Sequence, residues 1–430
     1  MKTLISFMFL ICFLPSSNLF SQIYSWYTLP NAPFSGRFED LHFINASTGW
    51  LISLNGTIHK TSDGGESWAL TDSVYQGSFR SVYFLNANTG WVGSLNTNFI
   101  LYKTTNGGID LTPVSNIPTP KPMGICGLHG IGNDFIYGCG TYQDSATFIK
   151  STDGGNTWIS KRLMQYTFTI IDSYFFNKDT GIAIGGRGSN FSSRLSTVLY
   201  TSDGGVNWTV NYLGSRPGEW GWKISFTDNQ NGFVSLERLN GPKFFTRTSN
   251  GGLNWTEHAF ENFNEQGIGF INPNTGWIGG DNQTTYGTTN GGLNWFNANI
   301  GMNINRFFMF GDTLGYACGQ TVYKYSKSVG ITVLSTSVPE NYSLSQNYPN
   351  PFNPVTKVKF DIPSGVRKPS DVKLIVFDGL GKEVVTLVNE QLSPGSYEAE
   401  FDGSNFASGI YFYKLESGSF VETKRMIMLK

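Results

Sequence analysis

The chain consists of short apolar stretches separated by polar turns. One unit recurs, in which a strand-like stretch ends in an aromatic residue and is followed by a polar turn and then by Gly with a second aromatic residue. Clear copies are Phe43–Trp50, Phe84–Trp91 and Phe270–Trp277, and looser ones end at Tyr137, Ile182, Phe233 and Tyr316. Stretches rich in aromatic and β-branched residues and bounded by turn residues predict short strands. The pattern therefore predicts an all-β chain.

A second pattern follows six of these seven units. It is a Ser or Thr, then Asp or Asn, then two glycines and, in five copies, a Trp three residues later; the copy at 104–111 has Leu111 instead. The Asp or Asn positions are Asp63, Asn106, Asp153, Asp203, Asn250 and Asn290. Successive units of the first kind end 39 to 51 residues apart, which is typical of one blade of a β-propeller.

The two ends of this region complement each other. After Tyr316 the chain supplies a third strand, Gln320–Tyr325, but no Trp strand follows it, whereas Tyr24–Leu29 is a Trp strand with no unit before it. We therefore predict that the Trp26 strand completes the last blade. Residues 22–326 would then form a seven-bladed propeller of four-stranded blades, and ring closure would remove exposed sheet edges.

The repeated Asp or Asn could suggest a metal or acid–base array, but the residue types argue against one. Three copies have Asn, which keeps a hydrogen-bond acceptor and loses the charge. A side chain that accepts backbone N–H groups in its own turn meets that need, and the two glycines allow positive φ. We therefore interpret all six positions as structural turns.

These repeats resemble the Asp-box (BNR) repeat, and most closely the propeller of photosystem II assembly factors and their secreted bacterial relatives. The resemblance covers about residues 23–326 and implies the propeller fold. It does not determine the function, because Asp boxes occur in sialidases, xyloglucanases, sortilin-like receptors and plain binding proteins. Photosystem assembly is not expected of a secreted protein.

Candidate binding residues lie at the start of the innermost strands. When each strand is aligned on its last aromatic residue, the position four residues earlier holds Glu39, Arg80, Cys126, Ile171, Trp222, Gln266 and Arg306. Strand alternation predicts an apolar register here, yet five of the seven are polar or a large aromatic. One explanation is a solvated rim. The other is a ligand-binding channel mouth formed by Arg80, Trp222 and Arg306, with Arg37 and Trp220 adjacent.

A glycoside hydrolase of the sialidase or xyloglucanase kind is the alternative to a non-catalytic binding or scaffolding propeller. Such enzymes need two carboxylates that face one cleft. Only Glu39, Asp40, Asp172 and Glu219 lie near the innermost strands, and alternation places Glu39 and Asp40 on opposite sides of one strand. The binding role is therefore favoured, with no catalytic residue, and a glycan or a protein remains open as the ligand.

The first residues predict a signal peptide. Lys2 is followed by the apolar stretch Leu4–Leu14, which is too short to span a bilayer, and by a polar, small-residue segment. We expect residues 1–21 to be removed by cleavage before Gln22. Lipoprotein processing at Cys12 is not expected, because Cys12 lies inside the apolar stretch. No later stretch predicts a transmembrane helix.

Composition gives no reason to expect a cofactor, a metal or nucleic acid. Charged residues make up 14% of the chain and the net charge is -1, so no basic surface for a polyanion is indicated. Beyond the signal peptide, Cys126, Cys139 and Cys318 show no metal-binding or disulfide spacing. We expect buried thiols, with a Cys126–Cys139 bridge as the alternative in an oxidising compartment.

The composition changes after Tyr325. Residues 327–342 are predicted to be a linker, and 343–430 a small Ig-like β-sandwich that begins with a proline-rich segment, Asn347–Pro354. The predicted strands are 356–362, 372–377, 383–388, 396–401, 410–415 and 421–429. The sequences DGLG at 378–381 and DGSN at 402–405 are predicted turns.

Four segments of this region, in order, resemble the type A sorting domain of the type IX (Por) secretion system. They are YPNPFNP at 348–354, FDGLGKEV at 377–384, GIYFYKL at 409–415 and ETKRMIMLK at 422–430. The resemblance implies export via the periplasm through the outer-membrane translocon, removal of this domain by the sorting peptidase, and attachment to surface lipopolysaccharide. The mature protein would be secreted or held on the outer-membrane surface. The alternative is an ordinary Ig-like adhesion module.

Overall fold

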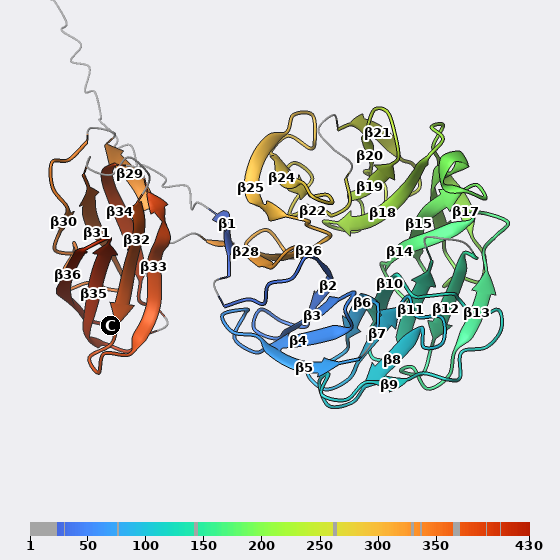
Figure 1. Ribbon diagram of the computed structural model, residues 1–430, viewed down its shortest axis with the longest axis horizontal. Coiled ribbons are helices and arrows are strands. Elements are labelled where there is room, and N and C mark those ends of the chain that lie inside the picture. Colours follow the sequence, from blue (N-terminus) through green and yellow to red (C-terminus); the bar gives the residue numbers. More distant parts are fainter. Residues whose placement is uncertain are drawn as a thin grey trace, which may run out of the picture. The chain divides into compact units, whose positions relative to one another are not determined.

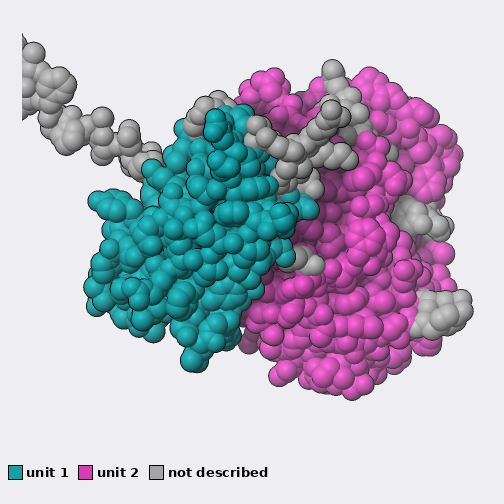
Figure 2. Space-filling model, turned by 60° about the vertical axis from the view of Figure 1, so that its left-hand side comes forward, with its two compact units in different colours: residues 1–24, 327–430 teal, residues 25–326 magenta. Residues whose placement is uncertain are grey.

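The chain forms two compact units, one of residues 25–326 and one that contains residues 327–430 (Figure 2). The computed structural model describes residues 24–29, 31–74, 77–141, 145–260, 265–327, 331–335, 338–363, 370–392, 394–404 and 406–430. The predicted signal peptide, with Cys12, lies outside these residues. The all-β prediction is confirmed: the described elements are strands and one short 3-10 turn, Phe191–Ser193.

The first unit contains seven four-stranded antiparallel sheets among its described residues. Six of them are made of consecutive strands. These are β2 (Phe38–Phe43), β3 (Gly49–Ser53), β4 (Thr57–Thr61) and β5 (Ala69–Ser73); β6 (Phe79–Phe84), β7 (Gly90–Ser94), β8 (Leu101–Thr104) and β9 (Thr112–Pro113); β10 (Gly127–Ile131), β11 (Phe135–Gly140), β12 (Thr147–Ser151) and β13 (Ile159–Arg162); β14 (Thr169–Phe175), β15 (Gly181–Arg187), β16 (Leu195–Thr201) and β17 (Thr209–Leu213); β18 (Glu219–Phe226), β19 (Gly232–Arg238), β20 (Phe244–Thr248) and β21 (Thr256–Ala259); β22 (Ile268–Phe270), β23 (Gly276–Ile278), β24 (Thr284–Thr288) and β25 (Phe296–Met302).

The remaining sheet joins the two ends of the unit. Its order is β1 (Tyr24–Thr28), β28 (Val322–Lys327), β27 (Leu314–Cys318) and β26 (Arg306–Phe310). The side chain of Trp26 in β1 packs against Trp277, Phe307 and Tyr325, with ring centroids 5.3, 5.6 and 5.4 Å away. Each innermost strand contacts the innermost strand of the next sheet, and β26 contacts β2, so the sheets surround one axis (Figure 1).

Stacked aromatic pairs hold several neighbouring sheets together. In each pair, the aromatic residue of a second strand stacks on the last aromatic residue of the next innermost strand. The pairs are Trp50–Phe84, Tyr137–Phe175, Phe233–Phe270 and Tyr316–Phe43, with centroids 3.6, 3.6, 3.5 and 3.8 Å apart. The last pair spans the junction between the final and first sheets. The glycine before Trp50 is needed, because a Cβ at Gly49 would lie 2.5 Å from the ring of Phe43.

The six Asp or Asn turns share one hydrogen-bond arrangement. Oδ1 of Asp63 accepts from the Thr61 hydroxyl at 2.8 Å and from the Ser67 backbone N–H at 2.9 Å. Asn250 makes the same two bonds, at 2.9 Å from Thr248 and 3.0 Å from Asn254. The corresponding oxygens of Asn106, Asp153, Asp203 and Asn290 accept equivalent bonds. One neutral acceptor oxygen is therefore sufficient for this turn.

The three thiols are buried and unbridged. Cys126 packs with Trp220 and Trp222, whereas Cys139 lies in a different apolar cluster, around Tyr137. Cys318 belongs to a third cluster. Burial raises the pKa of the Cys139 and Cys318 thiols, so both are protonated at neutral pH.

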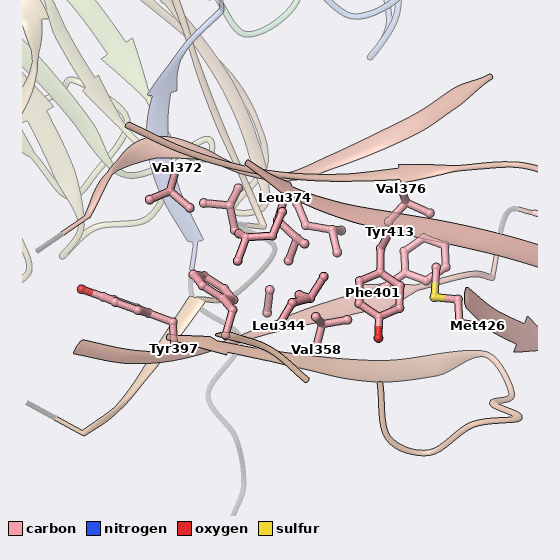
Figure 3. Close-up of a cluster of buried hydrophobic side chains, with 14 of the residues drawn as sticks. Leu344, Val358, Val372, Leu374, Val376, Tyr397, Phe401, Tyr413 and Met426 are labelled. Carbon is pink, nitrogen blue, oxygen red and sulfur yellow. The ribbon is translucent and has the colours of Figure 1, made fainter. Parts of the chain in front are cut away.

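The second unit contains two four-stranded sheets that face each other across a common apolar core. One sheet has the order β29 (Ile331–Ser335), β34 (Gly395–Asp402), β31 (Val355–Ile362) and β30 (Ser343–Leu344); the other has β33 (Glu383–Leu392), β32 (Ser370–Phe377), β35 (Gly409–Ser417) and β36 (Phe420–Met428). Figure 3 shows Leu344, Val358 and Phe401 pointing toward Val372, Leu374, Val376 and Tyr413.

The predicted linker differs from the structure in one respect. Residues 331–335 within it form β29 and pair with β34. Apolar Ile331 and Val333 alternate with Thr332, which is a strand pattern. Sequence reasoning missed this strand because the surrounding segment is rich in small residues. Each of the six strands predicted downstream overlaps an observed strand.

Candidate functional site

β-Bulges in four innermost strands change which side chains reach the axis. In β2, Phe38 pairs with Ser53 and Asp40 with Ile52, so Glu39 is an extra residue. Equivalent register shifts fall at Arg80, at Ile171 and at Trp222–Lys223. A bulge breaks the alternation of side chains along a strand. Sequence reasoning placed Glu39 and Asp40 on opposite sides of β2 because it assumed this alternation, and the bulge at Glu39 removes that basis. In the structure both residues are buried, and both carboxylates make ion pairs.

Strand register sorts the axial side chains into three layers. The Glu39 layer contains Glu39, Arg80, Cys126, Ile171, Trp222, Gln266 and Asn305. The Arg306 layer contains Asp40, Ser81, Gly127, Asp172, Lys223, Gly267 and Arg306. The His42 layer contains His42, Tyr83, His129, Tyr174, Ser225, Gly269 and Phe308.

The sequence alignment placed Arg306 in the wrong layer. It equated Phe310 with Phe43, the last aromatic residue of β2, and so grouped Arg306 with Glu39. In the structure Met309 pairs with Gly315 as Phe43 pairs with Gly49, which groups Arg306 with Asp40 instead. The shift arises because β26 continues one apolar residue beyond the paired glycine.

The Glu39 layer is a buried network of charged and aromatic groups. Glu39 forms ion pairs with Arg80 and with Arg37, whose Nε is 2.9 Å from Oε1. Asn305 Nδ2 donates to Glu39 Oε2 at 3.0 Å, and Trp222 Nε1 donates to Asn305 Oδ1 at 2.8 Å. The Arg80 guanidinium lies 4.8 Å from the centroid of the Trp222 ring, a cation–π arrangement. All seven residues of the layer are buried.

Arg306 links three different sheets. Its Nε donates to Asp40 at 2.7 Å, and its two terminal nitrogens donate to the two oxygens of Asp172 at 2.9 and 3.3 Å. Burial by itself would raise the pKa of Asp172, but Arg306 and Lys223 outweigh it and hold the pKa below the ordinary value. The same carboxylates raise the pKa of Arg306. Asp172 and Arg306 are therefore both charged at neutral pH.

The two aspartates have no carboxylate oxygen left without a donor. Besides Arg306, Asp40 accepts the backbone N–H groups of Leu41 and Val82, and Asp172 accepts those of Ser173 and Ile224. Lys223, in the same layer, is completely buried, and its Nζ has no hydrogen-bond partner among the described residues. Burial, and then the charge of Arg306, lower the pKa of Lys223 to about 8. Lys223 is thus mostly charged at neutral pH and lacks an acceptor.

Several axial side chains cap the free edges of the innermost strands. In the part of the chain that the structure describes, these strands pair with no strand on their axial side, so some backbone N–H groups need other acceptors. His42 Nδ1 accepts the N–H of Phe84 at 3.3 Å, and His129 Nδ1 accepts that of Phe175 at 3.4 Å. An imidazole whose Nδ1 accepts carries its proton on Nε2 when neutral. Burial lowers the pKa to about 3 for His42 and about 4 for His129, so both are neutral at pH 7.

The predicted mouth residues are largely withdrawn from solvent. Arg80, Trp220 and Trp222 are buried, and the side chains of Arg306 and Arg37 are 14% and 20% exposed. Arg37, Arg80 and Trp222 meet around Glu39 and Asn305, whereas Arg306 lies in the next layer. Trp220 Nε1 donates to Glu237 instead, at 3.1 Å.

Sequence reasoning missed Lys223, Asn305 and Glu237 at this site. Lys223 and Asn305 directly adjoin the predicted residues Trp222 and Arg306, but alternation assigned them to the other face. The cue available in the sequence was the unusual run of polar residues at these strand starts, which is typical of bulges near functional sites. Glu237 lies on the second strand of its sheet, and no pattern in the sequence indicated it.

Glu219, the remaining carboxylate predicted near the innermost strands, is paired away from the axis. It accepts from the Ser196 hydroxyl at 2.6 Å and from Arg216 Nε at 2.8 Å. Among the described residues, no group of three or more His, Cys, Asp or Glu side chains is arranged to hold a metal ion. Within the same residues, no helix has the length and apolarity needed to cross a membrane.

In the second unit the proline-rich segment is hydrogen-bonded to β35 and to the edge of β36. The backbone N–H of Asn347 donates to the Tyr413 hydroxyl at 2.8 Å, and that hydroxyl donates to a neighbouring backbone carbonyl. Asn350 Oδ1 accepts the N–H of Ile427 at 3.0 Å, and Phe352 donates its N–H to the Ile427 carbonyl at 3.0 Å. The proline-rich segment thus covers the free edge of the C-terminal strand.

Comparison with solved structures identifies the fold of the first unit. YCF48 bound to D1 peptide and YCF48 from Cyanidioschyzon merolae each align with a TM-score of 0.53 and 18% identity, covering 70% of this chain and 96% and 98% of those chains. The WD40 β-propeller domain of Doa1 aligns with a TM-score of 0.52 and 11% identity over 71% of this chain and 98% of that one. At these identities the likeness concerns the fold alone, which is a β-propeller. No curated protein matches the chain.

The second unit is identified by its sequence. Its four recognisable segments occur in order, and the hydrogen bonds around Asn347, Asn350 and Tyr413 join the first of them to the third and the fourth. Residues 346–429 match the family described as the secretion system C-terminal sorting domain, so the chain carries a sorting domain of that family C-terminal to its propeller.

Proposed function

We propose that this chain is a cell-surface or secreted protein whose propeller is a non-catalytic binding or scaffolding module. The carrying observation is the sorting domain at 346–429, which implies export by the type IX secretion system. Passage through the periplasm, cleavage of the tail by the sorting peptidase and attachment to surface lipopolysaccharide belong to this proposal. A tail that folds as a unit of its own supports it, because the export signal can then be removed without disturbing the propeller.

The charge pairing at the axis supports a non-catalytic role. Asp40 and Asp172 bind one guanidinium and therefore lie close together, as the carboxylates of a glycosidase do. A glycosidase also needs one of its two carboxyl groups protonated, with a raised pKa. Arg306 instead lowers the pKa of Asp172 and occupies the space between the two acids. The arrangement supports an electrostatic link between sheets better than it supports acid–base catalysis.

The export proposal is tested by deleting residues 341–430 and following the chain in a bacterium that has the type IX system. We expect the truncated chain to accumulate in the periplasm, folded, while the full chain reaches the surface or the medium. The full chain in a strain without the translocon is the matched control and should also remain periplasmic. Normal levels of the truncated chain outside the cell would contradict the proposal.

The binding role is tested with the purified full chain on glycan and protein arrays, alongside turnover assays with aryl glycosides, including sialosides. We expect saturable binding to one class of ligand and no glycoside turnover. Turnover that is lost on Asp172→Asn would instead support the hydrolase alternative.

A further inference from the structure

Three side chains at the axis carry hydrogen-bond donors that have no partner among the described residues. Lys223 has an ammonium group without an acceptor, and the described residues supply no partner for Nε2 of His42 or His129. Buried polar groups without partners are uncommon and call for an explanation. Asp40 and Asp172 lie in the same layer, but their hydrogen bonds come from Arg306 and backbone N–H groups, and Lys223 donates to neither of them.

Exposure shows from which side a ligand would reach these donors. The Glu39 layer is buried throughout, so it closes the axis on that side. The His42 layer, on the side of the Asp or Asn turns, is half-buried apart from its glycine. Beyond it, Ile44, Leu85, Ile131, Phe176, Thr227, Ile271 and Phe310 are also half-buried. Solvent therefore reaches the His42 layer, and the completely buried Lys223 lies in the layer directly beneath it.

The walls of this approach are aromatic. The ring of His42 lies 4.9 Å from Tyr83 and 5.2 Å from Phe308, and the ring of His129 lies 4.9 Å from Tyr174. These five residues come from five different sheets. Together with Lys223 they form what we call the axial cluster, which combines apolar walls with a small number of convergent polar groups, as ligand sites commonly do.

We propose that the axial cluster binds a ligand that carries a carboxylate on an apolar body, entering from the face that bears the Asp or Asn turns. Lys223 and the imidazole N–H groups of His42 and His129 donate to the carboxylate, and the aromatic rings surround the apolar part. This inference rests on the proposed binding role of the propeller.

The acceptor count favours a carboxylate over water. Each carboxylate oxygen can accept two hydrogen bonds, and the group donates none. A water molecule in the same place accepts only two bonds and carries no charge to pair with the Lys223 ammonium group. The negative charge also adds to the attraction of Asp172 and Asp40 for Lys223, whose pKa burial and Arg306 still lower to about 8.

The four histidines of the chain provide a direct readout, because two lie in the axial cluster and two, His59 and His258, lie outside it. Benzoate is titrated into the full chain while the imidazole nitrogens are followed by NMR, with benzamide as the uncharged probe of the same shape. We expect benzoate to shift Nε2 of His42 and His129 only, and benzamide to shift neither. No shift, a shift of all four histidines, or equal binding of benzamide would overturn the proposal.

Matched variants test the donors individually. His42→Asn keeps an acceptor for the Phe84 N–H and removes the Nε2–H donor, so it should weaken benzoate binding about tenfold, as expected for one lost charge-assisted hydrogen bond. His59→Asn is the control and should bind normally. Lys223→Met should abolish binding. It is assayed well below its melting temperature, because Lys223 also helps to keep the buried Asp172 charged and its removal is expected to cost some stability.

Equal benzoate affinity of His42→Asn and His59→Asn would overturn the assignment, even if Lys223→Met failed to fold. Normal export and array binding together with failed benzoate binding would refute only this inference and leave the proposed function intact.

Discussion

Removal of Arg306 tests whether the axis is held together by the ion pairs described above. Arg306→Met keeps most of the side-chain volume but leaves Asp40 and Asp172 buried and close together without their cation. Three hydrogen bonds to carboxylate oxygens are lost, from 2.7 to 3.3 Å long. Breaking one side of a buried ion pair typically costs about 3–5 kcal/mol of unfolding free energy. We expect a loss in that range, because the guanidinium is only 14% exposed.

The pH dependence provides a second check. In the parent chain the pKa of Asp172 is lowered, so its contribution to stability is present above the unfolded pKa and is lost as pH falls through the folded pKa. Without Arg306 the buried Asp172 carboxylate lies beside Asp40 without its cation, so the pKa of Asp172 rises above its ordinary value. The stability difference between parent and variant should therefore be largest at neutral pH and above, and should shrink as pH falls through that raised pKa, which lies above the ordinary Asp value of about 4.

Tryptophan fluorescence during urea unfolding is the suitable assay. All eleven Trp residues lie between Trp26 and Trp295, so the signal reports the propeller and not the sorting domain. Arg187→Met, at an exposed arginine of the same unit, is the control and should unfold like the parent. Adding Asp40→Asn and Asp172→Asn to Arg306→Met should recover much of the loss, because neither position then holds a buried carboxylate that has lost its cation. A loss below about 1 kcal/mol at pH 7, or one that does not vary with pH, would refute the ion-pair account.

Two further changes test the turns and the ring closure by the same assay. Asp63→Asn should leave the unfolding free energy nearly unchanged, because one neutral oxygen serves the turns at Asn106 and Asn250, whereas Asp63→Ala should cost about 1 kcal/mol for the lost turn hydrogen bonds; equal losses in both variants would show that the charge matters. Trp26→Ala should cost about 2–3 kcal/mol, less than for a fully buried Trp because Trp26 is half-buried; an unchanged urea midpoint would mean that β1 contributes little to closing the ring.

The repeats made the fold predictable, whereas the bulges limited what could be predicted of the site. A glycine followed by a large apolar residue, as at Gly49 and Trp50, recurs at almost every sheet. The glycine is needed for its close contact with Phe43, and the Trp ring stacks on Phe84 of the next sheet. Such contacts leave a fixed spacing in the sequence. A bulge such as that at Glu39 leaves no comparable spacing, because it inserts one residue without changing the residues that flank it.

The same bulges explain why the candidate donors were overlooked. Strict alternation would point Lys223 away from the axis if Trp222 points toward it. In the structure Trp222 and Lys223 together lie opposite the single residue Ser235, and this bulge brings both side chains into the axial layers. His42 and His129 are ordinary strand residues by their sequence context. Their significance depends on the unpaired N–H groups of Phe84 and Phe175 in the next sheets, and such edges exist only once the ring has formed.

Edge capping and ligand binding make compatible demands on His42 and His129. Accepting a backbone N–H on Nδ1 fixes the proton on Nε2, so the structural bond also sets the tautomer that can donate into the axial cluster. Because burial keeps both rings neutral above about pH 4, the donors remain available over the whole physiological range. A substitution that removes both ring nitrogens, such as His42→Leu, should therefore reduce stability as well as benzoate binding. His42→Asn should reduce binding alone. An equal loss of stability in the two variants would show that Nδ1 of His42 does not cap the Phe84 N–H.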